Sequence, residues 1–227
     1  MHKESFMTVS TRRIKVWDLP LRLFHWSLLL CVAGAVISIE VADNIDWHQR
    51  FGIAVLTLLV FRLLWGIVGG QHARFANFLR SPASILSYVK RMKNEKGPTV
   101  GHNPLGALSV VGLLAVLLFQ AGSGLFLSDE IMFEGPLFKF VSGEIASILA
   151  EAHEANAGII FTLIGLHLAA ILFYRFVKRD NLIKPMLTGS KEVPAETPVQ
   201  DANGGSALLG LITLAVAAGV VWFIVTL

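Results

Sequence analysis

Apolar residues gather in five long runs along the chain, and no segment alternates apolar and polar residues as a half-buried strand would. A helix needs about 20 mostly apolar residues to cross a membrane. The runs lie at Leu21–Ile39, about Phe51–Val68, Leu105–Leu127, about Ala155–Val177 and Ala207–Leu227. The pattern therefore predicts five membrane-spanning helices.

The polar segments between the runs indicate how the chain is divided. Residues 1–180 hold the first four runs and are predicted to form one four-helix domain. Residues 181–205 are rich in proline, glycine and polar side chains, which is typical of a cytoplasmic linker. Residues 206–227 then form a separate fifth helix. The predicted fold class is all-α: a polytopic membrane protein with a four-helix bundle, expected to bind a cofactor, and an additional helix.

Composition agrees with a membrane protein and excludes several other classes. Hydrophobic residues make up 54% of the chain and charged residues only 15%, against about 25% charged in soluble domains. The mean hydropathy is +0.65. The single cysteine, Cys31, excludes a disulfide scaffold and a cysteine-rich metal cluster, and no C-x-x-C-H motif for covalent haem occurs.

Positive charges predict the orientation of the helices. With a cytoplasmic N-terminus, the inner segments hold sixteen Lys and Arg residues, whereas the outer loops hold only Arg50 and Lys139. Cytoplasmic loops carry the excess of Lys and Arg in membrane proteins. We therefore expect a multi-pass protein of the bacterial inner membrane with its N-terminus in the cytoplasm and its C-terminus in the periplasm.

The outer loops are acidic, and this acidity has two interpretations. It can reflect simple solvation of the loop ends, or it can form a docking surface for a basic soluble partner. The nine acidic residues are Glu40, Asp43, Asp46, Asp129, Glu130, Glu134, Glu144, Glu151 and Glu154.

Histidines in or beside the apolar runs are the main candidates for chemistry, because ionisable groups in membrane spans are rare. His25 lies near the cytoplasmic start of the first run, and His48 lies at the outer start of the second. His153 and His167 lie fourteen residues apart in the fourth, which is about 21 Å along a helix and roughly 40° short of four full turns. These two histidines therefore share one helix face, near opposite membrane surfaces.

Depth alone predicts two histidine pairs, His25 with His167 and His48 with His153. Two imidazoles from different helices suit a planar cofactor clamped in the bundle with two axial nitrogen ligands. Zinc is a poorer match, because the pairs lack a third and fourth ligand at the same depth. For each histidine alone, a hydrogen-bonded core residue is the competing interpretation.

Two further residues are candidates beside the cofactors. Arg62 follows His48 by fourteen residues and needs an anionic partner, such as a haem propionate, unless it extends to the cytoplasmic headgroups. His102, at the start of the third run, titrates in the range useful for proton exchange with a quinone. Asn103 before Pro104 indicates a helix cap.

Several short motifs resemble the prokaryotic cytochrome b561 superfamily, which includes the b-type subunits of nickel–iron hydrogenases. The resemblance covers roughly residues 14–185 and includes the His153 and His167 spacing. The motifs are VWDLPLRLFHW at Val16–Trp26, WHQRFG at Trp47–Gly52, RLLWG at Arg62–Gly66 and GHNPLG at Gly101–Gly106.

The resemblance implies a four-helix core with two haem b groups, each bound by two of the four histidines His25, His167, His48 and His153. It also implies electron exchange between membrane quinone and a partner redox protein. We therefore expect a transmembrane di-haem cytochrome that connects the quinone pool with a basic periplasmic protein such as a c-type cytochrome. No nucleic-acid partner is expected, and self-association stays open.

Two alternative functions stay open. The first is a superoxide:quinone oxidoreductase, an enzyme proper, which the acidic outer loops disfavour because they would repel the superoxide anion. The second is a haem-bearing membrane anchor subunit of a hydrogenase-like complex, in which the fifth helix and its pair Ala215 and Gly219 would mediate contacts.

Overall fold

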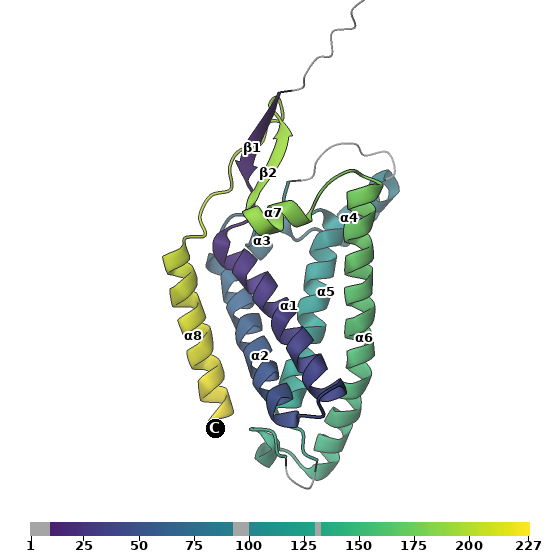
Figure 1. The fold of residues 1–227 in the computed structure, drawn as a ribbon, viewed down its shortest axis with the longest axis vertical. Helices are drawn as coiled ribbons and strands as arrows, with labels where there is room; N and C mark the ends of the chain where they lie inside the picture. Colours follow the sequence, from purple (N-terminus) through teal and green to yellow (C-terminus); the bar gives the residue numbers. More distant parts are fainter. Residues whose placement is uncertain (1–9, 93–99, 130–132) are drawn as a thin grey trace, which may run out of the picture.

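Five long helices dominate the structure, as the apolar runs predict (Figure 1). The computed structural model describes residues 10–92, 100–129 and 133–227. Within these residues, five helices have the length and apolar composition needed to cross a membrane. The long helices are α1 (Leu19–Glu40), α2 (Ile45–Val68), α5 (Pro104–Gly124), α6 (Gly143–Phe176) and α8 (Ala207–Val225).

Short elements fill the connections between the long helices. They are β1 (Thr11–Lys15), α3 (Phe75–Phe78), α4 (Pro82–Met92), the 3₁₀ turn η1 (Phe138–Phe140), α7 (Ile183–Thr188) and β2 (Ser190–Pro194). We call the end of the bundle that carries β1, β2, α4 and α7 the sheet end (Figure 1). The opposite end, where α1 joins α2 and α5 joins α6, is called the acidic end.

Side-chain caps set the start of every long helix. Asp18, Asn44, Asn103, Ser142 and Ser206 each accept a hydrogen bond from the backbone N–H three residues ahead. Such a bond satisfies one of the N–H groups that a helix start leaves unpaired. The chain therefore enters each helix at a defined residue.

The fourth predicted span is longer than its apolar run. It begins at Gly143, after the Ser142 cap, and not near Ala155 as hydropathy alone predicts. Its 34 residues correspond to about 51 Å, whereas the hydrocarbon core of a bilayer is about 30 Å thick. The first turns of α6 therefore extend beyond the apolar layer at the acidic end.

Helix α2 is the centre of the packing. It contacts α1, α5 and α8, while α5 packs along α6. Its side chains Leu59 and Trp65 are fully buried, and the cluster around them includes Leu21 and Phe24 of α1 and Leu117 of α5. The bundle is thus two helix pairs, α1 with α2 and α5 with α6, that meet through α2 and α5.

The segment predicted as a linker contains secondary structure of its own. Strand β2 pairs antiparallel with β1, with Ile14 opposite Lys191, so two segments far apart in the sequence form a small sheet. Ile14, Val16 and Val193 bury their side chains together at this sheet. The apolar runs did not indicate this sheet, because apolar residues in two short polar segments can be buried only when the segments meet.

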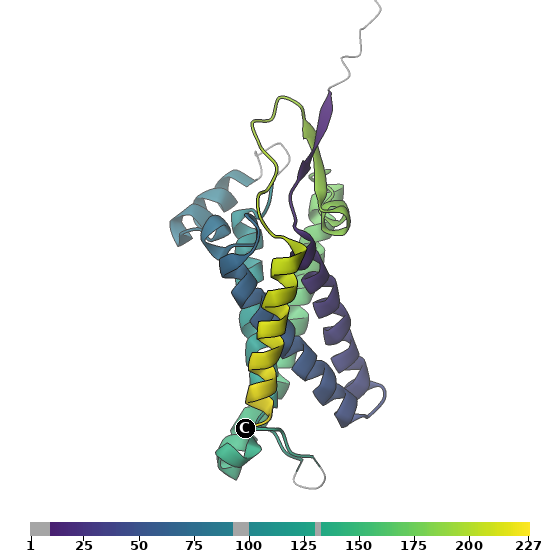
Figure 2. The ribbon, with the colours of Figure 1, turned by 90° about the vertical axis from the view of Figure 1, so that its left-hand side faces the viewer.

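Helix α8 runs along the outside of the bundle from the sheet end to the acidic end (Figure 2). Its buried residues are Gly210, Thr213, Ala217 and Val221. Ala215 and Gly219, the small pair noted in the sequence, are exposed and point away from this packed face. Gly210 is needed for close approach, because a Cβ there would lie 2.6 Å from Cγ of Pro20.

We expect Gly210→Leu to weaken the packing of α8, whereas Gly219→Leu should be tolerated because nothing lies within 4 Å of a Cβ at position 219. Overpacking a tight contact costs about 1–3 kcal/mol. The thermal unfolding midpoint of the purified chain in detergent should fall for Gly210→Leu and stay unchanged for Gly219→Leu. Equal midpoints for the two variants would contradict the packed face assigned to α8.

Candidate functional site

Four histidine rings form two facing pairs between the helix pairs of the bundle. The ring centroids of His25 on α1 and His167 on α6 are 6.5 Å apart. Those of His48 on α2 and His153 on α6 are 6.2 Å apart. His25 and His167 form the sheet-end pair, and His48 and His153 form the acidic-end pair. Because both pairs use α6, one helix contributes to a site near each end of the bundle.

The spacing within each pair matches two imidazoles on opposite sides of one metal ion. A metal–imidazole bond of about 2.0–2.1 Å, plus roughly 1 Å from each nitrogen to its ring centre, places the two centroids about 6 Å apart. Among the described residues, no three His, Cys, Asp or Glu side chains gather to hold a metal ion. The pairs therefore suit a metal whose remaining ligands come from a planar ring system, as in haem.

Both histidines of the acidic-end pair have a hydrogen-bond partner at Nδ1. Nδ1 of His48 lies 2.9 Å from the carbonyl oxygen of Ala35, which can only accept, so this nitrogen donates. Nδ1 of His153 lies 3.0 Å from Oγ of Ser123. Histidine ligands of metals almost always use their second nitrogen in this way. Nε2 of His48 is then left with the lone pair that a metal requires.

The sheet-end pair is held differently. Nδ1 of His25 is buried and has no hydrogen-bond partner. The ring instead packs edge-on against Trp26, with centroids 5.0 Å apart. Nε1 of Trp26 donates to the carbonyl of Met186 in α7, at 3.3 Å. The position of His25 therefore depends on packing between α1 and the segment that follows α6.

Arg62 lies deep in the bundle toward the sheet end. It is 2% exposed, and its guanidinium stacks 4.7 Å from the ring centre of Phe75. One of its nitrogens, Nη1, has no hydrogen-bond partner, although the carboxylate of Asp18 is close enough to interact with its charge. A buried guanidinium with an unpaired donor can bind a further anionic group.

His102 lies beside Arg62 in an aromatic setting. Its ring centroid is 4.7 Å from that of Trp17 and 4.5 Å from that of Phe78, and its Nδ1 is buried without a hydrogen-bond partner. Burial, together with the nearby Arg62 and His72, lowers the pKa of His102 to about 4. His102 is therefore uncharged at neutral pH. The expectation that it titrates in the range of an ordinary histidine was wrong, because burial disfavours the charged ring.

Asn103 serves as a helix cap, as its position before Pro104 indicates. Its Oδ1 accepts from the N–H of Gly106 at 2.7 Å, and its Nδ2 donates to the hydroxyl of Tyr174 at 2.7 Å. Tyr174 in turn shares a hydrogen bond with the hydroxyl of Tyr88. Asn103 thus connects the start of α5 with α6 and, through Tyr174, with α4. Both polar atoms of its side chain have hydrogen-bond partners within the protein.

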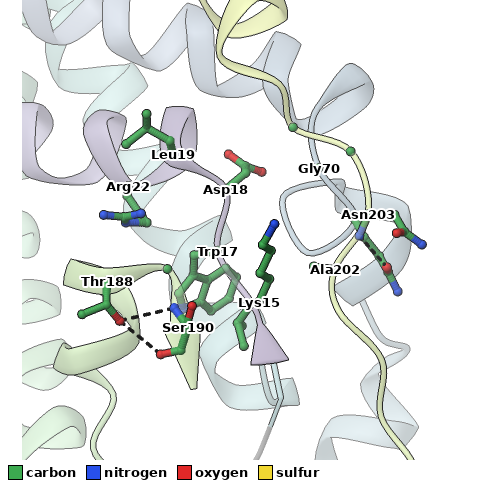
Figure 3. A pocket seen from close by; sticks show the side chains of 15 residues that line it. Lys15, Trp17, Asp18, Leu19, Arg22, Gly70, Thr188, Ser190, Ala202 and Asn203 are labelled. Atoms are coloured by element: carbon green, nitrogen blue, oxygen red, sulfur yellow. Dashed lines mark hydrogen bonds between the residues drawn. The ribbon is translucent and has the colours of Figure 1, made fainter. Parts of the chain in front are cut away.

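A polar cavity of about 270 Å³ lies at the sheet end, among Lys15, Trp17, Asp18, Arg22 and the segment before α8 (Figure 3). Asp18 lines this cavity, and its carboxylate also accepts a hydrogen bond from Nε1 of Trp65 at 3.1 Å. Burial raises the pKa of Asp18.

The wall of this cavity includes residues that sequence reasoning assigned only to a linker. Gly205 has a φ of +77°, and a Cβ there would lie 2.5 Å from Cβ of Asp18. The sequence pattern marks this glycine as flexible, but the structure shows that it permits a close approach. Contacts between segments so far apart in the chain carry no local sequence signal.

The acidic end gathers the loop carboxylates predicted from the sequence. Eight of the nine acidic residues lie in the described part of the chain, and all eight are exposed. Glu130 falls outside the described residues. The exposed cations there are Arg50, which stacks on Trp47, and Lys139, which donates to the carbonyl of Leu227. Two segments distant in sequence therefore present one negatively charged surface.

Comparison with known proteins links this arrangement to one family. Residues 16–189 match the family model of the prokaryotic cytochrome b561. The match includes α1, α2, α5 and α6 and ends before β2 and α8. No solved structure matches the chain.

Three similar proteins share one name, "probable Ni/Fe-hydrogenase B-type cytochrome subunit". The one from Azotobacter chroococcum mcd 1 is 24% identical over 222 residues, which cover 82% of this chain and 91% of that protein. The one from Azotobacter vinelandii is 23% identical with the same coverage. The one from Rhizobium leguminosarum bv. viciae is 21% identical over 81% of this chain and 90% of its own length.

Burial of His102 should lower the stability of the protein in acid. Below pH 6.5 the unfolded chain takes up a proton at His102 that the folded chain does not. The free energy of unfolding should therefore fall by on the order of 3 kcal/mol from this residue as the pH drops from about 6.5 to about 4. Thermal unfolding of wild type and His102→Gln between pH 7.5 and 4.5 measures the difference. Equal losses of stability in the two proteins would show that His102 is not buried uncharged.

Proposed function

The chain belongs to the prokaryotic cytochrome b561 family and is a membrane haem b electron-transfer protein. We propose that it holds two haem groups, through which electrons pass between membrane quinone and a periplasmic redox protein. The two imidazole pairs are the observation that carries this proposal. The ring separations of 6.5 and 6.2 Å are those expected for two imidazoles that would hold one haem iron. The pairs also lie toward opposite ends of the bundle, as electron transfer across a membrane needs.

We assign His25 and His167 as ligands of one haem b and His48 and His153 as ligands of the other. When bound, haem b would supply a one-electron redox centre, and two histidines of the chain would hold each haem. The chain itself orients the acidic-end ligands through Ala35 and Ser123. It holds the sheet-end ligand His25 by packing against Trp26.

Arg62 is our candidate for binding an anionic propionate of the sheet-end haem. Its guanidinium is buried, and its Nη1 has a donor to spare. Asp18 alone does not satisfy the guanidinium, since its carboxylate already caps α1 and binds Trp65. A charged group buried in a span normally has a partner of opposite charge.

The distribution of charge supports an orientation in which the chain spans a bacterial inner membrane and the sheet end lies on its cytoplasmic side. Lys and Arg residues of β1, α4 and the segment after α6 lie at this end, whereas the cations among the described residues of the acidic end are Arg50 and Lys139. Cytoplasmic loops carry the positive excess. In this orientation both the acidic end and the C-terminus face the periplasm.

Quinone exchange is assigned to the sheet end, beside His102. His102 is uncharged at neutral pH, has an unpaired Nδ1 and contacts Trp17, which also lines the polar cavity. Oxidation of one quinol to quinone releases two electrons and two protons. The protons leave at the sheet end, and two molecules of a one-electron carrier accept the electrons at the acidic end; the reverse direction needs the same numbers.

The acidic end is proposed to dock a basic partner such as a c-type cytochrome. Eight exposed carboxylates give this surface its charge. Complementary charge speeds the association of redox partners and makes it dependent on salt. The same negative charge would repel superoxide, so oxidation of superoxide is a poorer match to this surface.

A second candidate function follows from the relatives. Because the relatives are named probable hydrogenase B-type cytochrome subunits, the electron-transfer partner can instead be a hydrogenase-like complex in which this chain is the membrane subunit. The assignments of the four histidines are the same in both cases. Only the protein docked at the acidic end differs.

Single substitutions of the ligands should remove haems in a paired pattern. His25→Ala and His167→Ala should each lose one haem, and His48→Ala and His153→Ala should each lose the other. A double variant within one pair should lose no more haem than a single variant, because each haem depends on both of its ligands. Pyridine haemochrome assays and redox titrations of the purified proteins distinguish the two haems.

His72→Ala is the matched control, since His72 packs edge-on against Trp17 outside both pairs. It should keep two haems. If His48→Ala and His153→Ala lost different haems, the pairing would be wrong.

Charge reversal at the acidic end should slow electron exchange with a basic c-type cytochrome. We expect Asp43→Lys with Asp46→Lys to lower the second-order rate constant roughly tenfold or more at low salt, with the difference shrinking as salt screens the charges. Stopped-flow kinetics of the reduced protein in detergent measure this rate. Glu192→Lys at the sheet end is the control, and a rate lowered equally by both changes would contradict docking at the acidic end.

A further inference from the structure

We propose that Ser123 is a positioning residue for His153 and sets the reduction potential of the haem at the acidic end. This inference rests on the proposed function, in which His48 and His153 hold that haem. Its starting point is a set of buried polar side chains between α5 and α6, which run side by side (Figure 1). Ser123 and Asn156 are only 5% and 6% exposed.

Binding of a metal through Nε2, as the proposed function requires, leaves the proton of His153 on Nδ1. The Ser123 hydroxyl donates its one hydrogen to the carbonyl of Gln120, at 3.1 Å. Its lone pair is then free to accept from Nδ1 of His153, at 3.0 Å. Ser123 is therefore placed to hold the ring of His153 in the orientation that directs Nε2 toward the metal.

A second contact one turn along α6 keeps these partners in place. Nδ2 of Asn156 donates to Oε1 of Gln120 at 2.7 Å and to the carbonyl of Val116 at 3.0 Å. The His153 ring also packs closely over Gly124, where a Cβ would lie 3.3 Å from Cε1 of the ring. The ring is therefore restrained by a hydrogen bond on one side and by the α5 backbone on another.

A substitution at Ser123 should affect the acidic-end pair and not the sheet-end pair. Nδ1 of His48 bonds to a backbone carbonyl, and Nδ1 of His25 has no partner. Within the described part of the chain, Ser123 is thus the side chain whose removal alters the hydrogen-bond partner of a paired histidine. A change at Ser123 should affect the acidic-end haem and leave the sheet-end haem alone.

The sign of the effect follows from ligand basicity. An acceptor at Nδ1–H makes the imidazole a stronger electron donor through Nε2. A stronger donor stabilises the oxidised iron more than the reduced iron, which lowers the reduction potential. Loss of the Ser123 hydroxyl removes the acceptor that lies 3.0 Å from Nδ1 of His153, so the potential of the acidic-end haem should rise.

The test is a redox titration of the purified full-length chain, followed by absorbance and by electron paramagnetic resonance. Wild type is compared with Ser123→Ala, with the conservative Ser123→Thr, and with Thr213→Ala. Thr213 is also a buried hydroxyl in a membrane helix, but it bonds only to its own helix at Leu209. The transition missing from His48→Ala identifies the acidic-end haem.

We expect Ser123→Ala to shift the acidic-end transition to higher potential and to change its low-field resonance, while the other transition is unchanged. Ser123→Thr and Thr213→Ala should behave as wild type. If Ser123→Ala lost the acidic-end haem altogether, its retention in Ser123→Thr would support the same role for the hydroxyl.

Two results would overturn the inference. One is a Ser123→Ala variant with both transitions at their wild-type potentials. The other is a Ser123→Thr variant that shifts or loses haem as Ser123→Ala does, because the cause would then be packing. In both cases wild type would still hold two haems, so the proposed function would stand. A wild-type chain without a second haem would instead reject the proposed function itself.

Discussion

The arrangement of the bundle depends on the polarity of imidazoles buried between membrane helices. Water is absent from the hydrocarbon core, so each buried nitrogen needs a partner within the protein or its cofactor. In this chain Ala35 and Ser123 are the hydrogen-bond partners of Nδ1 in the two acidic-end histidines, while Nδ1 of His25 has no partner in the protein. The helices that carry these rings, α1, α2 and α6, are positioned so that the rings face each other at about the separation a haem iron requires.

The two ends of the bundle differ in ways that fit separate tasks. At the sheet end, cationic segments, a small sheet and a polar cavity surround Trp17, Asp18 and Arg62. At the acidic end, exposed carboxylates surround a site whose histidines both have hydrogen-bond partners. A cytochrome that connects a membrane-dissolved carrier with a water-soluble one needs this kind of asymmetry. Helix α8 lies outside the family match and packs on α2, so it adds to the bundle without contributing a histidine.

Much of the fold was predictable from hydropathy, because a membrane helix must be a long apolar run. The five spans, and the cap at Asn103, follow from local sequence. The start of α6 was not predictable from hydropathy, since its first turns lie beyond the apolar layer and depend on the Ser142 cap. The pairing of β1 with β2 and the approach of Gly205 to Asp18 join segments far apart in the chain, which periodicity does not encode. For the same reason the sequence indicated the four histidines but not Ser123 or Asn156, whose roles depend on which faces of α5 and α6 meet.

The central claim is that the four histidines bind two haems, and haem content tests it most directly. A pyridine haemochrome assay on the purified chain, with protein quantified in parallel, should give two haem b groups per chain when the protein is made with an adequate haem supply. A value of one would contradict the assignment of one pair. The absence of haem would contradict the account as a whole.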